Sequence, residues 1–569
     1  LEEKSINKLE SKLTNNLNVN IGIAHTRWAT HGPKTDLNAH PHNDCNNKLS
    51  LVHNGIITNY QCIKDKLENK GYKFNSETDT EVISNLISSE LDIKNPFNSI
   101  KKSLDQLDGT WGLVIMLKEK PNSLFISRSG SPLLLGKTTN GIIVASEISA
   151  FCNLTNKIYE IEDGEILEIN IEDNKVNSNE LNNYCLNNFL NMTKKIKVER
   201  NCIKQSPYPF NHWMMKEIFE QPMAVLRTLN YGARIHNSKV KLGGLDISKN
   251  LILNKNRIII IGCGTSLNAG KWVSYYYKKL KVFDSVLVID ASEFELYEIT
   301  EIEKTVCLVL SQSGETKDVH RCMNKIKTLN IPIIGIVNVV GSLIARESTC
   351  GIYLNAGREV AVASTKSFMC QMIGLLLVGL WYTQNTNKDN VLSNELVKEV
   401  LYVSSMIDNV LNSLDTYKNI AKYLCNHHSC FILGRNMCKA IADEAALKLK
   451  EIGYIHAEGF AGGSLKHGPF SLIENGTPVF LLILDDEYRE YMVSTLEEVK
   501  TRGAYTIVIT NCDLNDNAKI DEIITIDKMK VLSSIPIIVP FQLIAYEMAL
   551  IKNNDPDYPR NLAKVVTVD

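Results

Sequence analysis

The sequence predicts a multidomain protein in which an N-terminal α+β layer domain precedes two doubly wound α/β lobes. Three observations predict this fold class. The chain has 569 residues, which is too long for one hydrophobic core. Its first part has short strand-like runs bounded by turn signals, and after a polar segment at 170–197 apolar strands alternate with helices. The second part also repeats itself, as described below.

The first part combines strands with a few helices. The runs 111–117, 123–128 and 141–146 have the composition of β-strands, and 59–69 and 79–90 have helical patterns. This mixture is typical of an α+β domain.

The second part contains an internal repeat with an offset of 172 positions. Gly262 and Gly434 each end an apolar strand, and the strands 306–310 and 334–338 map by the same shift onto 478–482 and 506–510. A shared offset in three strands indicates a duplication. The predicted boundaries are a first domain at 1–185, a linker and helical lead-in at 186–244, a first lobe at 245–400, and a second lobe with a C-terminal tail at 401–569.

Composition excludes some partners. The formal net charge of −2 gives no electrostatic reason for binding nucleic acid or a membrane surface. The longest apolar stretch, 372–382, is far shorter than the roughly 20 residues that cross a bilayer, and reads as a buried helix. Fourteen cysteines occur without a CxxC pair, which indicates reduced thiols and a cytoplasmic location.

A loop rich in hydroxyl groups follows the strand 306–310. It carries Ser311, Gln312, Ser313, Gly314 and Thr316 and opens a helix whose apolar positions are Val319, Met323 and Ile326. Backbone N–H groups and the dipole at a helix start favour an anion, and hydroxyl groups add donors. Helix capping is the alternative, but one hydroxyl is enough for a cap. The loop therefore predicts a phosphate site.

The loop 262–266 (GCGTS) allows a rival interpretation. Gly262 and Gly264 resemble the start of a dinucleotide-binding turn, but Leu267 stands where the third glycine belongs. A dinucleotide would also leave the second lobe unexplained. The equivalent places in that lobe hold 435–436 and 485–486, and the two aspartates at 485–486 would repel a phosphate.

The second lobe carries ionisable side chains elsewhere. Lys448 and Glu451 are three residues apart on one face of a predicted helix, a spacing that usually means a solvated ion pair, but their neighbours are apolar. His467 stands in a loop bounded by Gly and Pro, where a proton carrier and a structural histidine are equally plausible.

Six segments together resemble the glutamine–fructose-6-phosphate aminotransferase family. They are GCGTS (262–266), SQSGET (311–316), VASTK (362–366), ALKLKEIGYIHAEGF (446–460), LKHGP (465–469) and PRNLAKVVTV (559–568). The family joins an N-terminal-nucleophile glutaminase, a class II amidotransferase domain, to two sugar-isomerase (SIS) lobes. It makes glucosamine 6-phosphate and glutamate from fructose 6-phosphate and glutamine, and the resemblance implies no cofactor and no metal.

The resemblance implies roles for residues of the lobes. His467 would open the sugar ring, Lys564 would form a Schiff base with the ketose carbonyl, Glu451 would move a proton between C1 and C2, and Lys448 would lie beside the sugar. The residues that would hold the sugar phosphate are Thr265, Ser266, Ser311, Gln312, Ser313, Thr316, Val362 and Ser364.

It also implies a glutamine site in the first domain. Arg27 would grip the α-carboxylate and Asp79 the α-amino group, and Asn54 and Gly55 would form an oxyanion hole. Trp28, Thr30 and His31 complete this set. A metallohydrolase with His40 and His42 as ligands is a weaker alternative, because no acidic residue has HExxH-like spacing.

One departure from the family concerns the N-terminus. The chain begins at Leu1, and the family's N-terminal cysteine nucleophile has no counterpart, so we expect about 40 to 50 residues to be missing and glutamine hydrolysis to be absent. A homodimer is expected from the family. The alternative function is a non-catalytic sugar-phosphate regulator built from SIS lobes, but such a sensor needs neither a base nor a Schiff-base lysine.

Overall fold

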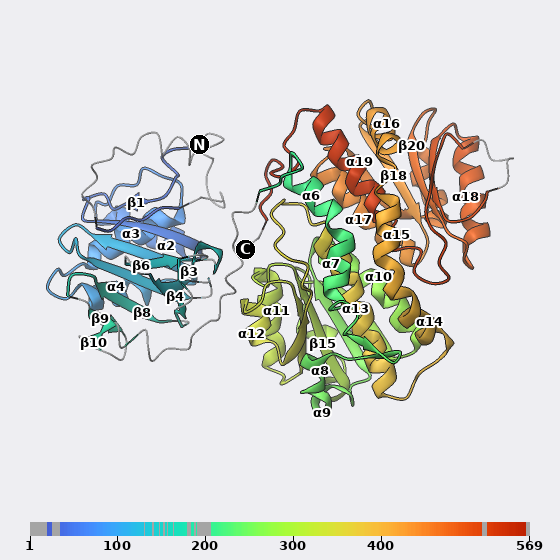
Figure 1. Cartoon of the computed structure of the whole chain (residues 1–569). Helices are drawn as coiled ribbons and strands as arrows, with labels where there is room; N and C mark the ends of the chain where they lie inside the picture. The colour runs from blue at the N-terminus through green and yellow to red at the C-terminus, as the bar shows by residue number, and fades with distance from the viewer. Residues whose placement is uncertain are drawn as a thin grey trace. The chain divides into compact units, whose positions relative to one another are not determined.

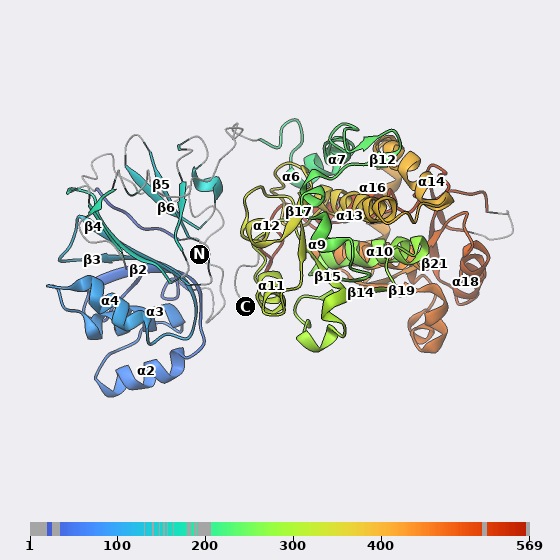
Figure 2. The same ribbon diagram turned by 90° about the horizontal axis from the view of Figure 1, so that it is seen from below.

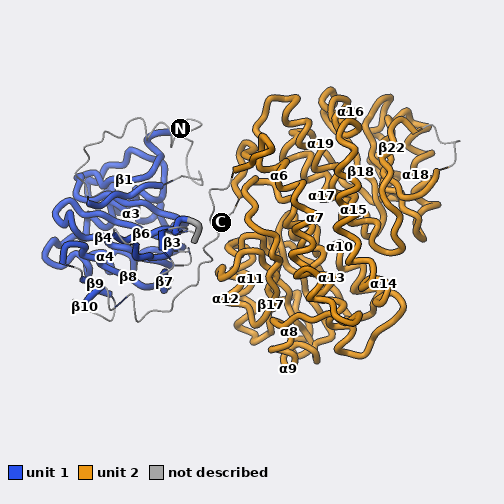
Figure 3. The backbone as a smooth tube through the Cα atoms, viewed as in Figure 1, with its two compact units in different colours: residues 1–205, 566–569 blue, residues 206–565 orange. Residues whose placement is uncertain are grey.

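The chain forms two compact units, residues 1–205 and 206–565 (Figure 3). The computed structural model describes residues 20–25, 35–129, 206–514 and 520–564, and residues between 131 and 189 with short gaps. The two units are described separately.

The first unit is built on two antiparallel sheets. The larger sheet has the order β1-β2-β3-β4-β8-β9-β10 and the smaller one β6-β5-β7. The strands are β1 His42–Asn43, β2 Leu49–Ile57, β3 Gly109–Leu117, β4 Ser123–Ser129, β5 Leu134–Lys137, β6 Ile142–Ala145, β7 Ile158–Glu160, β8 Ile166–Asn170, β9 Lys175–Ser178 and β10 Tyr184–Cys185. The predicted strands at 111–117, 123–128 and 141–146 are confirmed as β3, β4 and β6.

Three helices cover one face of the larger sheet, and the smaller sheet covers the other (Figures 1 and 2). They are α2 Tyr60–Asn69, α3 Asp79–Glu90 and α4 Pro96–Leu104, and the first two match the predicted helical patterns. Alternating side chains of β2 divide between the two layers: Leu51 packs with Ile83 under the helices, and Val52 packs with Leu135 towards the smaller sheet. Successive side chains of a strand point to opposite faces of the sheet, so β2 contributes to the packing of both layers.

The first lobe of the second unit is a five-stranded parallel sheet with the order β14-β13-β15-β16-β17. The strands are β13 Arg257–Gly262, β14 Ser285–Asp290, β15 Thr305–Ser311, β16 Ile333–Val337 and β17 Cys350–Tyr353. The connecting helices are α10 Gly264–Leu280, α11 Lys317–Lys327, α12 Leu343–Glu347 and α13 Lys366–Asn385. α11 buries Val319, Met323 and Ile326, as its periodicity predicts.

The second lobe repeats this topology as β19-β18-β20-β21-β22, also parallel. Its elements are β18 Ser429–Gly434, α17 Met437–Glu451, β19 His456–Ala461, β20 Pro478–Ile483, α18 Arg489–Thr501, β21 Tyr505–Thr510, β22 Glu522–Thr525 and α19 Ile538–Ile551. Strands β13, β16 and β17 begin 172 positions before β18, β21 and β22. The predicted duplication is therefore confirmed.

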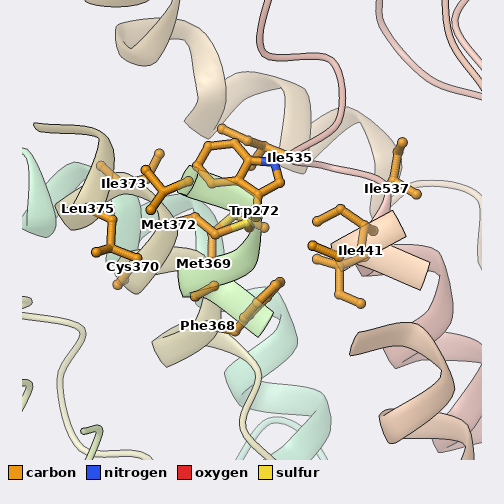
Figure 4. Close-up of a cluster of buried hydrophobic side chains, with 14 of the residues drawn as sticks. Trp272, Phe368, Met369, Cys370, Met372, Ile373, Leu375, Ile441, Ile535 and Ile537 are labelled. Atoms are coloured by element: carbon orange, nitrogen blue, oxygen red, sulfur yellow. The ribbon is translucent and has the colours of Figure 1, made fainter. Parts of the chain in front are cut away.

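One hydrophobic core joins the two lobes (Figure 4). Trp272 of α10 and Phe368 of α13 pack in it with Ile441 of α17, and Ile535 and Ile537 of the second lobe. The apolar stretch 372–382 lies inside α13 and is buried, as predicted. Because the core is continuous, the lobes fold as one unit.

Further helices and a hairpin surround this core. They are α6 Trp213–Phe219, α7 Gln221–Thr228, β11 Ile235–His236, β12 Lys239–Val240, α8 Gly243–Asp246, α9 Lys249–Ile252, α14 Val391–Glu399, α15 Val403–Val410 and α16 Leu414–Leu424. None of the helices in the described part of the chain has both the length and the apolar character needed to span a bilayer.

Candidate active site

The hydroxyl-rich loops lie at the carboxyl edge of the first lobe's sheet. β13 ends at Gly262 and leads into α10, and the neighbouring β15 ends at Ser311 and leads into α11. In open parallel sheets, ligands bind outside the carboxyl ends of the strands, where helix N-termini also point. The fold therefore places both predicted loops at the edge where a phosphate is expected.

The hydroxyl groups of the second loop bond to each other and to the loop backbone. The Ser311 hydroxyl lies 2.8 Å from that of Thr316 and accepts the Gly314 N–H at 2.9 Å. Ser313 accepts the Glu315 N–H at 3.1 Å. Thr316 is the N-cap residue of α11, but its side chain makes no capping bond. The capping interpretation therefore does not apply to Thr316, whereas Ser311 and Ser313 do shape the turn.

Gly314 allows this loop to close against a neighbouring turn. Its φ is +71°, and a Cβ atom there would lie 1.9 Å from Ser342 Oγ. Its carbonyl accepts the Ile344 N–H at 2.9 Å, and Glu315 accepts the Leu343 N–H at 2.9 Å. The turn before α12 thus holds the loop in place, and only glycine fits its centre.

Helix α17 of the second lobe brings a buried charged group to the first loop. Lys448 Nζ lies 2.6 Å from Glu451 Oε2, 3.4 Å from Glu444 Oε1 and 3.2 Å from the Thr265 hydroxyl. Thr265 in turn donates to Glu444 at 2.9 Å. The side chains of Lys448 and Glu444 are 1% and 0% exposed, and that of Glu451 is 21% exposed. The Lys448–Glu451 pair is therefore no solvated surface pair, and its carboxylate keeps access to solvent.

Burial and the neighbouring charges shift the pKa of Lys448 in opposite directions. Burial alone would lower the pKa of Lys448, but the carboxylates of Glu451 and Glu444 outweigh burial and raise it. Burial raises the pKa of Glu444, although the ammonium group of Lys448 and the amide of Asn268 both act to lower it. Lys448 is thus held as a cation between two carboxyl groups.

Helix α13 connects the first loop to the C-terminal tail. Gln371 donates to the Ser266 hydroxyl at 3.0 Å. At the start of the same helix, Glu359 accepts the N–H groups of Thr365 and Ser367, and its Oε2 lies 2.7 Å from Lys564 Nζ. A continuous series of contacts therefore runs from Lys564 through α13 to the loop that contacts Lys448.

The remaining predicted residues of the lobes are Val362, Ser364, Gln312 and His467. Val362 and Ser364 are half-buried in the loop before α13, and the Val362 N–H donates to the Asp557 carbonyl at 2.9 Å. Gln312 is half-buried in the hydroxyl loop. His467 is exposed on a short 3₁₀ helix, and no contact in the described residues joins it to Glu451.

Three of the predicted glutamine-site residues lie in the described part of the first unit. Asn54 and Gly55 are in β2, where Asn54 Oδ1 lies 2.5 Å from His25 Nε2. Asp79 begins α3 and accepts the Ile57 N–H at 2.9 Å, while Thr78 is the helix N-cap. Arg27, Trp28, Thr30 and His31 lie outside the described residues.

His40 and His42 of the first unit have non-metal partners. His42 Nε2 lies 3.1 Å from the Thr78 hydroxyl, and the ring of His40 packs edge-on against that of His42. Among the residues that the structure describes, no three His, Cys, Asp or Glu side chains form a group suited to a metal ion. The metallohydrolase alternative therefore gains no support there.

Comparison with known proteins identifies the family. A model described as a glutamine amidotransferase domain matches residues 25–153, and one described as a SIS domain matches 251–379 and again 423–552. A relative from Clostridium acetobutylicum, named glutamine–fructose-6-phosphate aminotransferase (isomerizing), is 39% identical over 99% of this chain and 91% of its own length. The chain belongs to the glutamine–fructose-6-phosphate aminotransferase family.

Other members of this aminotransferase family match as well. The Thermococcus kodakarensis enzyme of that name is 36% identical, over 97% of this chain and 89% of its own. A probable aminotransferase of the same name from Acanthamoeba polyphaga mimivirus is 37% identical over the same shares. The chain spans 89–91% of the length of these three relatives.

Solved structures agree with the aminotransferase assignment of the second unit. The C-terminal domain of the Francisella tularensis glucosamine–fructose-6-phosphate aminotransferase aligns with a TM-score of 0.58 and 31% identity, over 62% of this chain and all of its own. Tagatose-6-phosphate ketose/aldose isomerase from Escherichia coli aligns with a TM-score of 0.51 at 19% identity, over 61% of this chain and 95% of its own, which shows the shared fold. The predicted fold class of an amidotransferase-type domain followed by two SIS lobes is confirmed.

Three residues with contacts in this candidate site, Glu444, Glu359 and Gln371, were not predicted from the sequence. Glu444 lies four residues before Lys448 on the same helix, so helical spacing could have indicated it. Glu359 lies close to the VASTK segment, but nothing in the sequence pairs it with Lys564. Gln371 sits in an apolar helix, where a single amide is the only signal.

Proposed function

We propose that this chain transfers the amide nitrogen of glutamine to fructose 6-phosphate and isomerises the sugar, giving glucosamine 6-phosphate and glutamate. The observation that carries the proposal is the Thr265–Lys448–Glu451 group, in which a buried lysine contacts both a carboxylate and a hydroxyl group of the loop 262–266 in the first lobe. A lysine and a carboxylate next to a phosphate-type loop suit proton transfer on a sugar phosphate. The names of the curated relatives support the same substrates.

The first lobe would hold the sugar phosphate. Hydroxyl groups at two helix starts add donors to the backbone N–H groups and to the helix dipole, which together favour an anion. The proposed contacts are those of Thr265, Ser266, Ser311, Gln312, Ser313, Thr316, Val362 and Ser364.

The chemical steps would use four side chains. His467 opens the sugar ring, and Lys564 then condenses with the ketose carbonyl, which acidifies the neighbouring C–H. Glu451 carries the proton between C1 and C2, and Lys448 orients that carboxylate from 2.6 Å. The proposed reaction needs no cofactor.

The first unit would bind the glutamine that supplies the nitrogen and stabilise the oxyanion formed on its amide. Asn54 and Gly55 would supply oxyanion-hole donors on β2, and Asp79 would hold the α-amino group from the start of α3. The further residues proposed for this site are Arg27, Trp28, Thr30 and His31. The match of residues 25–153 to an amidotransferase domain supports this assignment.

A non-catalytic sugar-phosphate sensor is the weaker alternative. A sensor would need the hydroxyl loop, but the buried cation of Lys448 is costly to keep and serves no recognition of a neutral sugar ring. The enzyme is therefore favoured.

We also propose that the active molecule is a homodimer in the cytoplasm. His467 is exposed and makes no contact with Glu451 among the described residues, so a second copy of the chain can approach its imidazole. The twelve cysteines among the described residues are free thiols, in keeping with a reducing compartment.

The domain boundaries are proposed as 1–185, 186–244, 245–400 and 401–569. The division into SIS matches at 251–379 and 423–552 supports the last boundary. The helical lead-in α6–α7 contributes Met214 and Val225 to the common core of the lobes, so its helices fold with them.

The test is an incubation of the full chain with fructose 6-phosphate and glutamine. The expected products are glucosamine 6-phosphate and glutamate in equal amounts, measured by mass spectrometry. A second incubation without glutamine tests isomerisation alone, through formation of glucose 6-phosphate. Tight sugar-phosphate binding with neither product would support the sensor instead.

A further inference from the structure

The carboxylate of Glu359 is enclosed at the start of helix α13. Its side chain is 0% exposed. Oε1 accepts the N–H groups of Thr365 and Ser367 at 2.9 and 3.1 Å, and Oε2 accepts the Ser367 hydroxyl at 2.7 Å. The Thr365 hydroxyl also donates to Oε1 at 3.4 Å, and Lys564 Nζ lies 2.7 Å from Oε2. The carboxylate is therefore fixed by the helix start and aimed at one amine.

The surroundings keep this carboxylate ionised. Burial opposes the charge, but the ammonium group of Lys564 and the hydrogen bonds from α13 outweigh it and hold the pKa of Glu359 well below its usual range. The nearby Glu217 instead keeps its proton at neutral pH, because burial and the charge of Glu359 raise its pKa to about 8. Lys366 is engaged by Glu220 at 2.5 Å. Among the described residues, Glu359 is thus the ionised carboxylate that touches Lys564.

The lysine of this pair is less enclosed than its carboxylate. The Lys564 side chain is 19% exposed, whereas that of Glu359 is 0% exposed. Part of the Lys564 side chain therefore remains accessible while its ammonium group contacts the enclosed carboxylate.

We propose that Glu359 is a catalytic residue that takes a proton from the ammonium group of Lys564, so that the amine can attack the ketose carbonyl, and later returns it. This inference rests on the proposed role of Lys564 in imine formation. An ammonium group has no lone pair with which to attack, so an adjacent acceptor of its proton is required.

The proposed step balances in atoms and charge. The carboxylate of Glu359 removes one proton from Lys564, and the free amine forms a C–N bond to C2 while the carbonyl π electrons move to oxygen. That oxygen takes a second proton from the nitrogen, which gives a neutral carbinolamine. Glu359 then protonates the hydroxyl group, which leaves as water as the nitrogen lone pair forms the C=N bond. An ammonium ion and a ketone become a protonated imine and water, and Glu359 is unchanged.

The opposite possibility is that Glu359 only holds Lys564 in place as a counter-ion, a role that its lowered pKa also fits. The two roles predict opposite effects of removing its charge. A counter-ion favours the ammonium form, so its loss would leave more free amine and faster imine formation. Loss of a proton acceptor would slow imine formation by about 10²–10⁴-fold.

The test traps the imine on the full chain. Wild-type protein is mixed with fructose 6-phosphate and sodium borohydride, which reduces the C=N bond to a stable secondary amine, and the modified peptide is quantified by mass spectrometry. We expect sugar on Lys564 in the wild type and trapping slowed at least about 100-fold in Glu359→Gln. Glu359→Asp, which keeps the charge on a shorter side chain, should lie between the two.

Glu220→Gln is the matched control, because it breaks a second carboxylate–lysine pair in the same region without touching Lys564. It should trap sugar at the wild-type rate. The affinity of each variant for fructose 6-phosphate is measured by calorimetry, so that a loss of binding is not mistaken for a slow step.

The outcomes separate this inference from the proposed function. Absence of sugar on Lys564 in the wild type would overturn the imine assignment, and this inference with it. Normal trapping in the wild type, with equal or faster trapping in Glu359→Gln at intact sugar affinity, would overturn only the role of Glu359. If Glu359→Gln does not fold, the Glu359→Asp variant decides: wild-type trapping across pH 6 to 9 would overturn the role, and slower trapping would support it.

Discussion

Thr265 of the first lobe accepts a hydrogen bond from Lys448 of the second lobe at 3.2 Å. The two residues lie 183 positions apart in the sequence. The contact exists because α10 and α17, equivalent helices of the two repeats, pack against each other in the common core. The duplicated lobes have therefore specialised: one supplies hydroxyl groups at its sheet edge, and the other supplies ionisable side chains.

Removal of the buried cation should destabilise the fold. Lys448→Met leaves Glu444 and Glu451 without their counter-ion, and breaking a buried pair costs about 3–5 kcal/mol in the free energy of unfolding. Urea denaturation measures this loss. The control is Lys439→Met on the same helix. Lys439 is 33% exposed and its partner Asp443 is 23% exposed, so the loss of stability should stay below about 1 kcal/mol. Equal losses in both variants would contradict the buried role.

The carboxylate of Glu451 should be needed for catalysis but not for folding. Glu451→Gln keeps the shape and a hydrogen-bond acceptor for Lys448, but it removes one of the two carboxylates that balance this buried cation, so its melting temperature should fall and the assay is run where circular dichroism shows the variant folded. Isomerisation of fructose 6-phosphate to glucose 6-phosphate should fall by about 10²–10⁴-fold, since a proton carrier is lost. Near-normal turnover in a coupled assay would remove the assignment.

Thr316 should contribute to affinity for the sugar phosphate. A hydrogen bond to a charged group contributes about 1.5–3 kcal/mol, so Thr316→Val should raise the Kd for fructose 6-phosphate about 10–100-fold. Calorimetry measures this change. Thr328→Val at the other end of α11 removes an exposed hydroxyl bonded to Lys325 and should leave the Kd unchanged. A Thr316→Val variant with wild-type affinity would show that the hydroxyl serves only the loop.

Gly314 should tolerate no side chain. Gly314→Ala places a Cβ 1.9 Å from Ser342 Oγ at a φ of +71°, so the loop must move. We expect weaker binding of fructose 6-phosphate together with lower stability, followed by calorimetry and thermal unfolding. Gly463→Ala, where an added Cβ meets no atom within 4 Å, is the control for both readouts. Unchanged sugar affinity in Gly314→Ala would mean that the loop can shift without loss.

Glu217 should make stability depend on pH. Its pKa is raised in the folded state, first by burial and then by the charge of Glu359, from 4.5 to about 8. The folded state therefore binds more protons than the unfolded state between these values, and stability is full below pH 4.5 and falls as pH rises towards 8. Denaturation between pH 5 and 8.5 should show this loss. Glu217→Gln, which is neutral at every pH, should flatten the profile, and an unchanged slope would contradict the assignment.

The sequence by itself determined the elements, the duplication and the hydroxyl loop. Strands such as β3 and helices such as α11 follow from the spacing of their apolar residues, which is a local property. The 172-residue offset predicted two equivalent lobes. The structure shows that the equivalent strands have the same order in both sheets. The turn from β15 into α11 was also visible, because the residue types that suit an anion stand next to each other.

Only the tertiary structure decided how charged groups pair. The sequence left open whether Lys448 is solvated or buried, because its spacing to Glu451 is typical of a surface pair whereas its neighbours are apolar. Its burial results from the packing of α17 against α10. Glu359 and Lys564 are 205 positions apart, and their contact depends on where the C-terminal tail lies against the start of α13. Local sequence sets which backbone a segment adopts, whereas the state of an ionisable group is set by burial and by neighbours that the fold brings from far along the chain.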